Sequence, residues 1–541
     1  MLRRAILVSL AVAALAAGPA TAAPSAPACT ETCFVAPAGS GPLFLFTGHG
    51  WGHGVGMSQY GAYGYAQHGS TYDQILAHYY PGTTLAPAPT TTFRVLLADK
   101  QRRLTLSSTL PFRVQDGNGT SVQLPAGTVT FGPGLAIGGS KLTAPLVFSP
   151  GKGGALTLKR AYRGRISVDV VDGKLRAIDV VGLEQYLDGV VPAEMPATWA
   201  PEALKAQAVA ARSYALATRN VAAPYDAYPD TRSQMYLGIS AETPATNAAV
   251  AATKRQVLLY DGKVATTYFS STSGGRTESS VDWTGTPVPY LVSVPDPYDT
   301  ISPYHDWGPV PVTAQTIAKA LKITGPITDA TTVPNAAGRV AKLNLVTTPA
   351  PVAVPGATLR AAVGLRSTWF SLGMISLAAP VPSTPVTYGS PLTLAGVVRG
   401  VSTTVELEQR PSGGTWQAVG PVGTGTLKLT QRPTVTTDYR LATPTAAAAF
   451  VRVRVAPSVS LTTFTATEVA GSEQPVLMGA TVQVQQQNPD ATWTTVASQP
   501  VAADGTFSVP VSLSPGGTYR VTVGPAAGYV AGSTAPQIVV R

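Results

Sequence analysis

Charged residues are scarce in this chain of 541 residues, since Asp, Glu, Lys and Arg together make up 12%. This composition excludes a coiled coil or a collagen-like repeat, and 45% hydrophobic residues argue against intrinsic disorder. The formal net charge is +10, yet Lys and Arg are scattered and form no long block. We therefore expect no nucleic-acid-binding arm, and the basic balance suits a protein that works near an anionic surface.

Long apolar runs are missing after the start of the chain. The exception, residues 5–17, follows Arg3 and Arg4 and precedes Thr21-Ala22-Ala23. A positive start, a short apolar run and a small-residue cleavage site are typical of a secretory signal peptide, which we assign to residues 1–23. No later stretch approaches the roughly 20 apolar residues that a helix needs to cross a bilayer. We therefore expect a secreted protein, extracellular or cell-wall associated, with no membrane span in its mature form.

Cysteine is nearly absent, and Cys29 and Cys33 are the two in the chain. In an oxidising compartment, their short spacing favours a small local disulfide. A metal pair is the weaker alternative, because two thiolates alone do not complete a tetrahedral site. No leucine-led lipobox precedes Cys29, so we do not expect a lipoprotein anchor.

The pattern of apolar residues changes along the chain. Residues 93–190 contain short strand-like segments, and Asp172-Gly173 between two of them is typical of a hairpin turn. Good helix formers fill residues 201–218, where Pro201 is suited to the first helical position. From about residue 380 onward the pattern is all-β.

The last part of the chain contains an internal repeat. Three pairs of segments recur with an offset of roughly 77–80 residues, one small β-sandwich each: Val405-Glu-Leu-Glu-Gln and Val482-Gln-Val-Gln-Gln, Trp416 and Trp493, Tyr439-Arg440 and Tyr519-Arg520. The sequence therefore predicts an α+β fold. We expect a mixed, strand-rich domain at residues 24–378 with one long central helix, followed by two all-β Ig-like sandwich modules at 379–457 and 458–541. Few charges and many Thr and Gln residues indicate spacer or adhesive modules, with an inert stalk as the alternative.

The helix expected at residues 201–218 carries two cations seven residues apart, Lys205 and Arg212. Residues at this spacing project from nearly the same side of a helix. They are either ordinary surface cations or a basic ledge that faces Glu194, which precedes the helix. A stripe of small apolar residues predicts close packing of the helix against a sheet: Leu204, Ala208, Ala211 and Ala215.

Glu194 stands among apolar residues in Val190-Val-Pro-Ala-Glu-Met-Pro. Partial desolvation there raises the pKa of a carboxyl group and keeps it protonated near neutral pH, as a general acid requires. The alternative is a Glu near a helix N-terminus that the helix dipole stabilises.

Four of the five histidines lie between residues 49 and 78. Two of them, His49 and His53, belong to a glycine-rich segment at residues 48–61, and so many glycines would destabilise a helix or a strand. The segment is a structural loop, a loop that lines a substrate site, or part of a zinc site, although no third ligand has a recognisable spacing. A P-loop is excluded because the Gly-Lys-Ser/Thr ending is missing.

The segment Ser270-Ser-Thr-Ser-Gly-Gly-Arg-Thr-Glu278 combines hydroxyl groups with a Gly-Gly turn. Such a polar rim is suited to hydrogen bonds with sugar hydroxyls, and a nucleophilic serine is the alternative. Within this segment there is neither Gly-x-Ser-x-Gly nor Ser-x-x-Lys, which disfavours serine hydrolase chemistry.

Together these segments resemble the SpoIID/LytB domain family, peptidoglycan-cleaving proteins related to stage II sporulation protein D. The resemblance covers about residues 43–376 and excludes the tail. The segments that carry it are Tyr162-Arg-Gly-Arg-Ile, Gly182-Leu-Glu-Gln-Tyr-Leu-Asp-Gly-Val-Val-Pro-Ala-Glu-Met-Pro, Ala203-Leu-Lys-Ala-Gln-Ala-Val-Ala-Ala-Arg-Ser-Tyr-Ala, Asp230-Thr-Arg-Ser-Gln-Met-Tyr-Leu-Gly, Ser271-Thr-Ser-Gly-Gly-Arg-Thr-Glu and Gly52-His-Gly-Val-Gly-Met-Ser-Gln-Tyr-Gly-Ala.

The order of these segments departs from the family. The glycine–histidine segment usually follows Leu-Arg-Ser-Thr-x-Phe, whereas here Leu365-Arg-Ser-Thr-Trp-Phe370 closes the domain and the glycine–histidine block, residues 43–80, opens it. A circular permutation explains this order and requires chain ends that lie close together. We therefore expect residues 46–62 to pack beside Phe370 and to line the same cleft as Glu194.

The resemblance implies a lytic transglycosylase that cleaves peptidoglycan glycan strands, particularly strands stripped of stem peptides, with no cofactor and no metal. One acid, Glu194, would protonate the leaving oxygen and then accept the proton of the sugar C6 hydroxyl, which gives 1,6-anhydro-muramic ends. The residues carried over as substrate-binding are Lys205, Gln207, Arg212, Tyr214, Ser271, Ser273, His53 and Gln59. The alternative from another class is a non-catalytic peptidoglycan-binding protein or a modifier of a cell-wall amidase.

Overall fold

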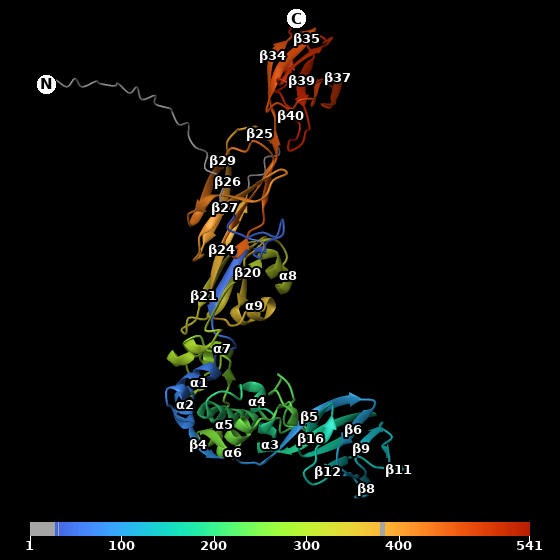
Figure 1. The fold of residues 1–541 in the computed structure, drawn as a ribbon, viewed down its shortest axis with the longest axis vertical. Helices are drawn as coiled ribbons and strands as arrows, with labels where there is room; N and C mark the ends of the chain where they lie inside the picture. Colours follow the sequence, from blue (N-terminus) through green and yellow to red (C-terminus); the bar gives the residue numbers. More distant parts are fainter. Residues whose placement is uncertain (1–26, 31, 379–384, 541) are drawn as a thin grey trace, which may run out of the picture.

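The computed structural model describes residues 27–30, 32–378 and 385–540, and the signal peptide predicted at residues 1–23 lies outside them. The described chain is elongated (Figure 1): helices form one end, a strand-rich region lies beside them, and β-rich modules follow toward the C-terminus. This strand-rich α+β character agrees with the expectation. Within these described ranges, no helix is both long and apolar enough to span a bilayer.

Helix α5 (Pro201–Thr218) is the centre of the helical end, with Pro201 near its N-terminus as expected. Its many alanines let neighbouring elements approach closely, and most of its residues are buried. The sequence predicts one apolar stripe against a sheet. Ala208, Ala211 and Ala215 of this stripe share one core with strand residues such as Val257, whereas Val209 belongs to a second core and Leu204 to a third. The surrounding elements are α1 (Gln59–Gln67), α2 (Tyr72–Tyr79), α3 (Leu183–Asp188), α4 (Val191–Glu194), α6 (Pro244–Ala252) and β17 (Gln256–Tyr260).

Residues 92–182 form a β-region with a core of its own beside the helices. One sheet has the order β5-β16-β15-β12-β7-β8 and the other β14-β13-β6-β9. The predicted hairpin turn at Asp172-Gly173 joins β15 to β16, and both turn residues have positive φ (49° and 68°), as this tight turn requires. The strands are β5 (Thr92–Gln101), β6 (Leu104–Ser108), β7 (Phe112–Gln115), β8 (Ser121–Leu124), β9 (Gly127–Phe131), β12 (Leu146–Pro150), β13 (Leu156–Leu158), β14 (Arg160–Tyr162), β15 (Arg165–Val171) and β16 (Lys174–Gly182).

A five-stranded sheet connects the helical end to the first C-terminal module. Its order is β20-β2-β24-β26-β29, so a strand from near the N-terminus is an inner strand, between β20 and β24. Residues on both sides of the predicted boundary at 378/379 share this sheet and one core. The predicted boundary therefore falls within one sheet and one core, to which residues 34–45 and 370–378 contribute. The strands are β2 (Leu43–His49), β20 (Asp306–Thr313), β24 (Phe370–Ala378), β26 (Leu392–Arg399) and β29 (Gly425–Gln431).

A second core packs against the part of this sheet nearest the helices, around Phe44, Phe46 and Trp307. It is completed by a small sheet in the order β21-β22-β23 and by two helices. These elements are β21 (Ile327–Pro334), β22 (Val340–Thr347), β23 (Val352–Pro355), α8 (Ala314–Leu321) and α9 (Gly356–Val363).

The other sheet of the first module also recruits the N-terminal segment, because β1 (Phe34–Val35) pairs with β31 (Ala446–Ala447). Cys29 and Cys33 form a disulfide, with Cα atoms 5.6 Å apart, and pack against this module. The further strands of this sheet are β27 (Val405–Pro411), β28 (Gln417–Val422), β30 (Thr437–Ala442) and β32 (Val451–Val453).

The second module, from residue 458 onward, has a separate core. The internal repeat is visible in its strand register: Gln409 lies opposite Tyr439 in the first module, and Gln486 lies opposite Tyr519 in the second. Its strands are β34 (Ser458–Phe464), β35 (Glu468–Gln474), β36 (Thr481–Gln487), β37 (Trp493–Pro500), β38 (Thr506–Pro510), β39 (Thr518–Val523), β40 (Gly532–Ser533) and β41 (Gln537–Ile538).

Candidate functional site

Residues 48–58, here called the glycine–histidine ribbon, lead from the end of β2 to the start of α1. Every second residue from Gly50 to Gly56 is a glycine with positive φ, a conformation that other residues rarely adopt. Space is a second reason for glycine, because a Cβ at Gly54 would collide with the guanidinium of Arg339. The ribbon is therefore a closely packed segment with a defined shape.

The ribbon joins parts of the chain that lie far apart in sequence. Gly48 lies opposite Phe370 in the pairing of β2 with β24, and the rings of Phe46 and Phe370 are 5.3 Å apart. Just beyond the ribbon, the side-chain amide of Gln59 donates a hydrogen bond of 2.9 Å to the backbone carbonyl of Glu194. The order of the sequence segments predicts this placement. The circular permutation that would explain the order stays a prediction.

Glu194 lies at a pocket of about 320 Å³. Its carboxyl group comes from the end of α4, while Tyr214 of α5 and His53 of the ribbon line the same pocket. The other lining residues are Thr231, Ser233, Gln234, Met235, Tyr268, Phe269 and Trp283. This mixture suits a sugar, whose hydroxyl groups form hydrogen bonds and whose C–H faces pack on aromatic rings.

The surroundings of Glu194 favour its protonated form. Burial raises the pKa of Glu194, and a hydrogen bond from the backbone N–H of Met235 opposes that shift only in part. A raised pKa keeps the proton on the carboxyl group at a higher pH than an exposed glutamate would, as a general acid requires. Among the described residues that line this pocket, Glu194 carries the one carboxyl group.

His53 forms a neutral part of the pocket wall. Its Nδ1 accepts a hydrogen bond of 3.0 Å from the backbone N–H of Val55, which places the ring proton on Nε2. Burial, assisted by the positive charges of Arg360 and Arg339, lowers the pKa of His53 to about 4. The ring stacks on Trp283, with centroids 4.8 Å apart. His53 therefore contributes shape rather than charge at neutral pH.

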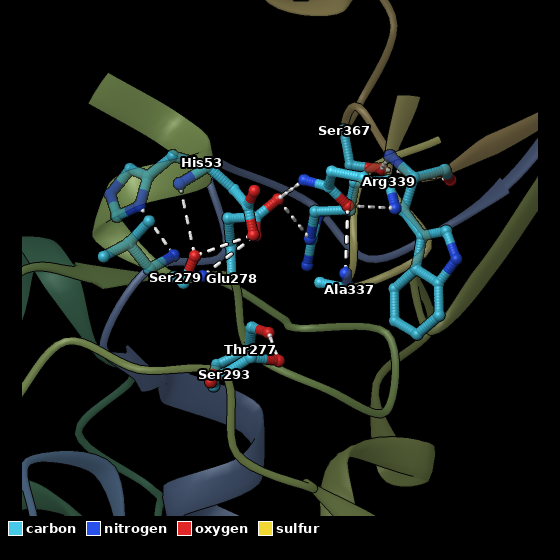
Figure 2. A network of polar contacts seen from close by, with 12 residues as sticks. His53, Thr277, Glu278, Ser279, Ser293, Ala337, Arg339 and Ser367 are labelled. Atoms are coloured by element: carbon cyan, nitrogen blue, oxygen red, sulfur yellow. Dashed lines mark hydrogen bonds and ion pairs between the residues drawn. The ribbon is translucent and has the colours of Figure 1, made fainter. Parts of the chain in front are cut away.

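Behind the ribbon, a buried ion pair between Glu278 and Arg339 supports Gly54 (Figure 2). The backbone N–H of Glu278 donates to the carbonyl of Gly54 at 2.8 Å. Its carboxylate accepts a hydrogen bond of 2.8 Å from Asn335 and lies 3.6 Å from the guanidinium of Arg339. Figure 2 shows His53 on one side of Glu278 and Arg339 on the other. The ion pair thus positions the ribbon and, with it, the His53 wall of the pocket.

The hydroxyl-rich segment at residues 270–278, which is interpreted from the sequence as a substrate rim, forms hydrogen bonds with two buried aspartates. Ser273 is buried and donates to Asp296 at 2.7 Å, and Ser58 donates to Asp299 at 2.6 Å. The hydroxyl of Ser273 is thus enclosed and bonded to Asp296, and its role in substrate binding stays a prediction. Ser271 is half-buried and lies outside the residues that line the pocket.

The two cations of α5 do not form a ledge that faces Glu194. Arg212 is fully buried, where it pairs with Glu184 at 2.6 Å and donates to backbone carbonyls. The fold thus encloses the guanidinium of Arg212, and substrate binding by this residue stays a prediction. Lys205 pairs with Glu202 at 2.6 Å on the same helix and does not line the pocket.

Gln59 and Gln207 support the acid from behind. Gln207 is fully buried on α5, and its Oε1 accepts a hydrogen bond of 3.3 Å from Gln59. No part of the Gln207 side chain is exposed, and its contact with substrate stays a prediction. Sequence reasoning missed residues 231–235 and Trp283 as pocket walls. The former lie in a segment that carries the family resemblance, whereas Trp283 stands in none of the quoted motifs.

Comparison with known proteins matches residues 171–260, which include Glu194 and all of α5, to the family described as SpoIID, stage II sporulation protein. The chain is 36% identical over 171 residues to stage II sporulation protein D of Bacillus subtilis (28% of this chain, 49% of that protein). It is 41% identical over 140 residues to the amidase enhancer of the same species (26% and 19%). An uncharacterized protein of Brachyspira hyodysenteriae is 38% identical over 136 residues (25% and 37%). The chain thus spans about half the length of these relatives or less.

Two solved structures show only weak likeness to the chain. A tetra-tandem repeat in the extending region of a large adhesion protein is 11% identical, over 84% of this chain and 99% of that chain, with a TM-score of 0.18. The FN1–FN3 domains of chicken CNTN1 are 14% identical, over 37% and 77%, with a TM-score of 0.13. Scores this low support no statement about a shared fold.

Proposed function

We propose that this chain, whose residues 171–260 match the SpoIID family, is a secreted lytic transglycosylase that cleaves peptidoglycan glycan strands. The family match and the relatives support a cell-wall role. The observation that carries the finer proposal is the pocket in which Glu194, with its raised pKa, is the one carboxyl group among the described lining residues. Strands stripped of stem peptides are the proposed preferred substrate.

A single carboxyl group is sufficient for this reaction, whereas hydrolysis commonly needs two. Hydrolytic glycosidases commonly use two, one to protonate the leaving oxygen and one to activate water or attack the sugar. In a lytic transglycosylase, the C6 hydroxyl of the muramic acid residue attacks C1 of the same sugar. Glu194 donates its proton to the glycosidic oxygen as the bond from C1 breaks. The resulting carboxylate accepts the proton of the C6 hydroxyl as the new C1–O bond forms, and the product is a 1,6-anhydro end.

The rest of the pocket has binding and orienting roles in this proposal. Trp283, backed by the neutral ring of His53, offers a flat aromatic face for a sugar ring. Tyr214 is half-buried at the same pocket and supplies a phenol hydroxyl for a hydrogen bond. The net charge of +10 favours approach to an anionic wall.

The test compares the wild-type protein with Glu194→Gln on purified glycan strands, with and without stem peptides. Mass spectrometry of the products would detect 1,6-anhydro-muramic ends. Gln keeps the shape of the side chain but has no transferable proton, so we expect these products to disappear. Glu202→Gln is the matched control, because its carboxylate pairs with Lys205 outside the pocket. Cleavage by Glu194→Gln near the wild-type rate would mean that the acid is elsewhere.

A second candidate is a non-catalytic wall protein that modifies an amidase, which the similarity to a protein named amidase enhancer favours. The two candidates differ in their products. A modifier releases no anhydro ends alone, sediments with cell walls and increases the release of stem peptides by an added amidase. That combination of results would replace the transglycosylase proposal.

A further inference from the structure

Three charged residues lie side by side across one sheet of the first module, at a pocket of about 340 Å³. Arg410 on β27 lies opposite Asp438 on β30, and Asp438 lies opposite Arg452 on β32. Asp438 accepts hydrogen bonds from both arginines, at 2.8 Å from Arg410 and at 2.7 and 3.0 Å from Arg452. We call these three residues the Arg–Asp–Arg row.

Aromatic rings hold the two guanidinium groups in position. The guanidinium carbon of Arg410 lies 4.8 Å from the ring centroid of Trp416 and 5.5 Å from that of Phe450. That of Arg452 lies 5.7 Å from the centroid of Phe450. Asp438 itself is buried. The row is therefore preorganised, so a ligand would not bear the full cost of ordering two long side chains.

The row keeps an uncompensated positive charge that faces solvent. The side chains of Arg410 and Arg452 are 36% and 58% exposed, whereas that of Asp438 is 6% exposed. Two guanidinium groups and one carboxylate give the row a net charge of about +1. Within the described part of the chain, Asp438 is the one hydrogen-bond acceptor of both groups, so other N–H donors are available to a ligand.

The internal repeat shows that the sandwich does not need this row. Gln409 of the first module corresponds to Gln486 of the second, so Arg410 corresponds to Gln487. The strand register then places Thr518 at the position of Asp438. Ile538 lies opposite Thr518, where the first module has Arg452.

A neighbouring pair of side chains, by contrast, makes the same kind of hydrogen bond in both modules. Arg440 donates to Glu408 at 2.7 Å in the first module, and Arg520 donates to Gln485 at 2.9 Å in the second. Both of these arginines also lie over a tryptophan, Trp416 or Trp493. The module framework is therefore repeated, while the Arg–Asp–Arg row belongs to the first module alone.

We propose that the Arg–Asp–Arg row binds a phosphodiester group of an anionic polymer. The net charge of the row matches the single negative charge of a phosphodiester. Guanidinium groups bind phosphate oxygens through forked N–H donors, and a tetrahedral phosphate presents its two free oxygens to donors on two strands. The site does not depend on glycan cleavage by Glu194.

The test measures binding of the full chain to immobilised poly(glycerol phosphate), with inorganic phosphate as a competitor. The triple variant Arg410→Gln/Asp438→Thr/Arg452→Ile carries the residues of the second module, whose sandwich forms without the row. We expect it to bind the polymer about tenfold more weakly or worse, because charge-assisted hydrogen bonds are lost. Lys428→Gln, an exposed position on β29 of the other sheet, is the control and should change affinity by less than about twofold.

A second variant, which introduces the row into the second module, distinguishes a loss of binding from a folding defect. Gln487→Arg/Thr518→Asp/Ile538→Arg should create a second site and roughly double the amount of polymer bound at saturation. Unchanged polymer binding by the triple variant at an unchanged melting temperature would overturn the proposal. Equal affinity for poly(glutamate) would overturn the phosphodiester assignment, as would binding of inorganic phosphate without binding of the polymer. Glycan cleavage in the same preparations reports on Glu194 independently.

Discussion

The side-chain amide of Gln59 donates a hydrogen bond of 2.9 Å to the backbone carbonyl of Glu194, across 135 residues of sequence. The same amide nitrogen lies 3.3 Å from Oε1 of Gln207, so α1, α4 and α5 meet at one polar point. Gln59 bonds the backbone rather than the carboxyl group. It is therefore a positioning residue, which fixes α4 and leaves the side chain of Glu194 free to face the pocket.

Gln59→Leu removes this hydrogen bond while keeping a side chain of similar size. We expect a loss of about 1–2 kcal/mol in the free energy of unfolding, because a buried carbonyl loses its donor. The rate of anhydro-end formation should fall further than the melting temperature alone explains, with the larger effect on kcat than on KM. Gln67→Leu, at the exposed end of the same helix, is the control and should leave both unchanged. A wild-type kcat in Gln59→Leu would remove the positioning role.

The raised pKa of Glu194 predicts a pH dependence of both stability and rate. Because the folded-state pKa lies above the unfolded one, the contribution of this group to stability is complete below the unfolded pKa and is lost as pH rises through the folded pKa. Glu194→Gln cannot ionise and escapes that loss. Its melting temperature should match the wild type near about pH 4 and exceed it near about pH 8.

The rate follows the same titration, because only the protonated carboxyl group can donate. We expect cleavage by the wild type to decline as pH rises through the raised pKa, measured as initial rates of anhydro-end formation across that range. The comparison with Glu202→Gln gives the baseline for loss of a carboxylate outside the pocket, where Glu202 pairs with Lys205 and accepts a hydrogen bond from the backbone N–H of Tyr72. A melting-temperature difference between wild type and Glu194→Gln that stays constant with pH would contradict the assigned burial of this group.

Substitutions of Arg212 and Lys205 should differ clearly in their effect on the free energy of unfolding. Arg212→Met leaves the carboxylate of Glu184 without its buried partner, so we expect a loss of about 3–5 kcal/mol in the free energy of unfolding. Lys205→Met breaks a partly exposed pair and should cost about 0–1 kcal/mol. Denaturant unfolding measures both. If both variants instead keep wild-type stability and lose affinity for glycan, the two cations bind substrate after all.

Short-range patterns predicted local structure well, for physical reasons. Helix α5 runs from Pro201 to Thr218, where a residue with fixed φ precedes a run of strong helix formers. The hairpin turn forms at Asp172-Gly173 because two adjacent residues there must adopt positive φ. The repeat was readable because identical residues, such as Trp416 and Trp493, stand at nearly constant spacing.

Partners from distant parts of the chain were not predictable in this way. The seven-residue spacing placed Arg212 on the side of Lys205, but it does not reveal that Glu184 and β17 enclose that side. The boundary at 378/379 was predicted from a change in the apolar pattern, whereas β24 and β26, on either side of it, pair in one sheet. Burial and sheet continuity depend on what packs from elsewhere, and a single sequence carries no direct record of it.

Trp283 was missed by the sequence motifs, and its place in the pocket leads to the sharpest test of substrate binding. One face of the indole stacks on His53 at 4.8 Å, and the residue lines the pocket that contains Glu194. If this ring packs against a sugar, Trp283→Ala should raise KM by about tenfold with a smaller change in kcat, because it removes a binding surface and leaves the acid in place. Trp51→Ala is the matched control, since Trp51 is also an exposed tryptophan of this region but does not line the pocket. Steady-state kinetics on glycan strands of defined length would measure both variants. An equal rise in KM for the two would show that the indoles contribute only a general affinity for the wall, and that the sugar does not rest on Trp283.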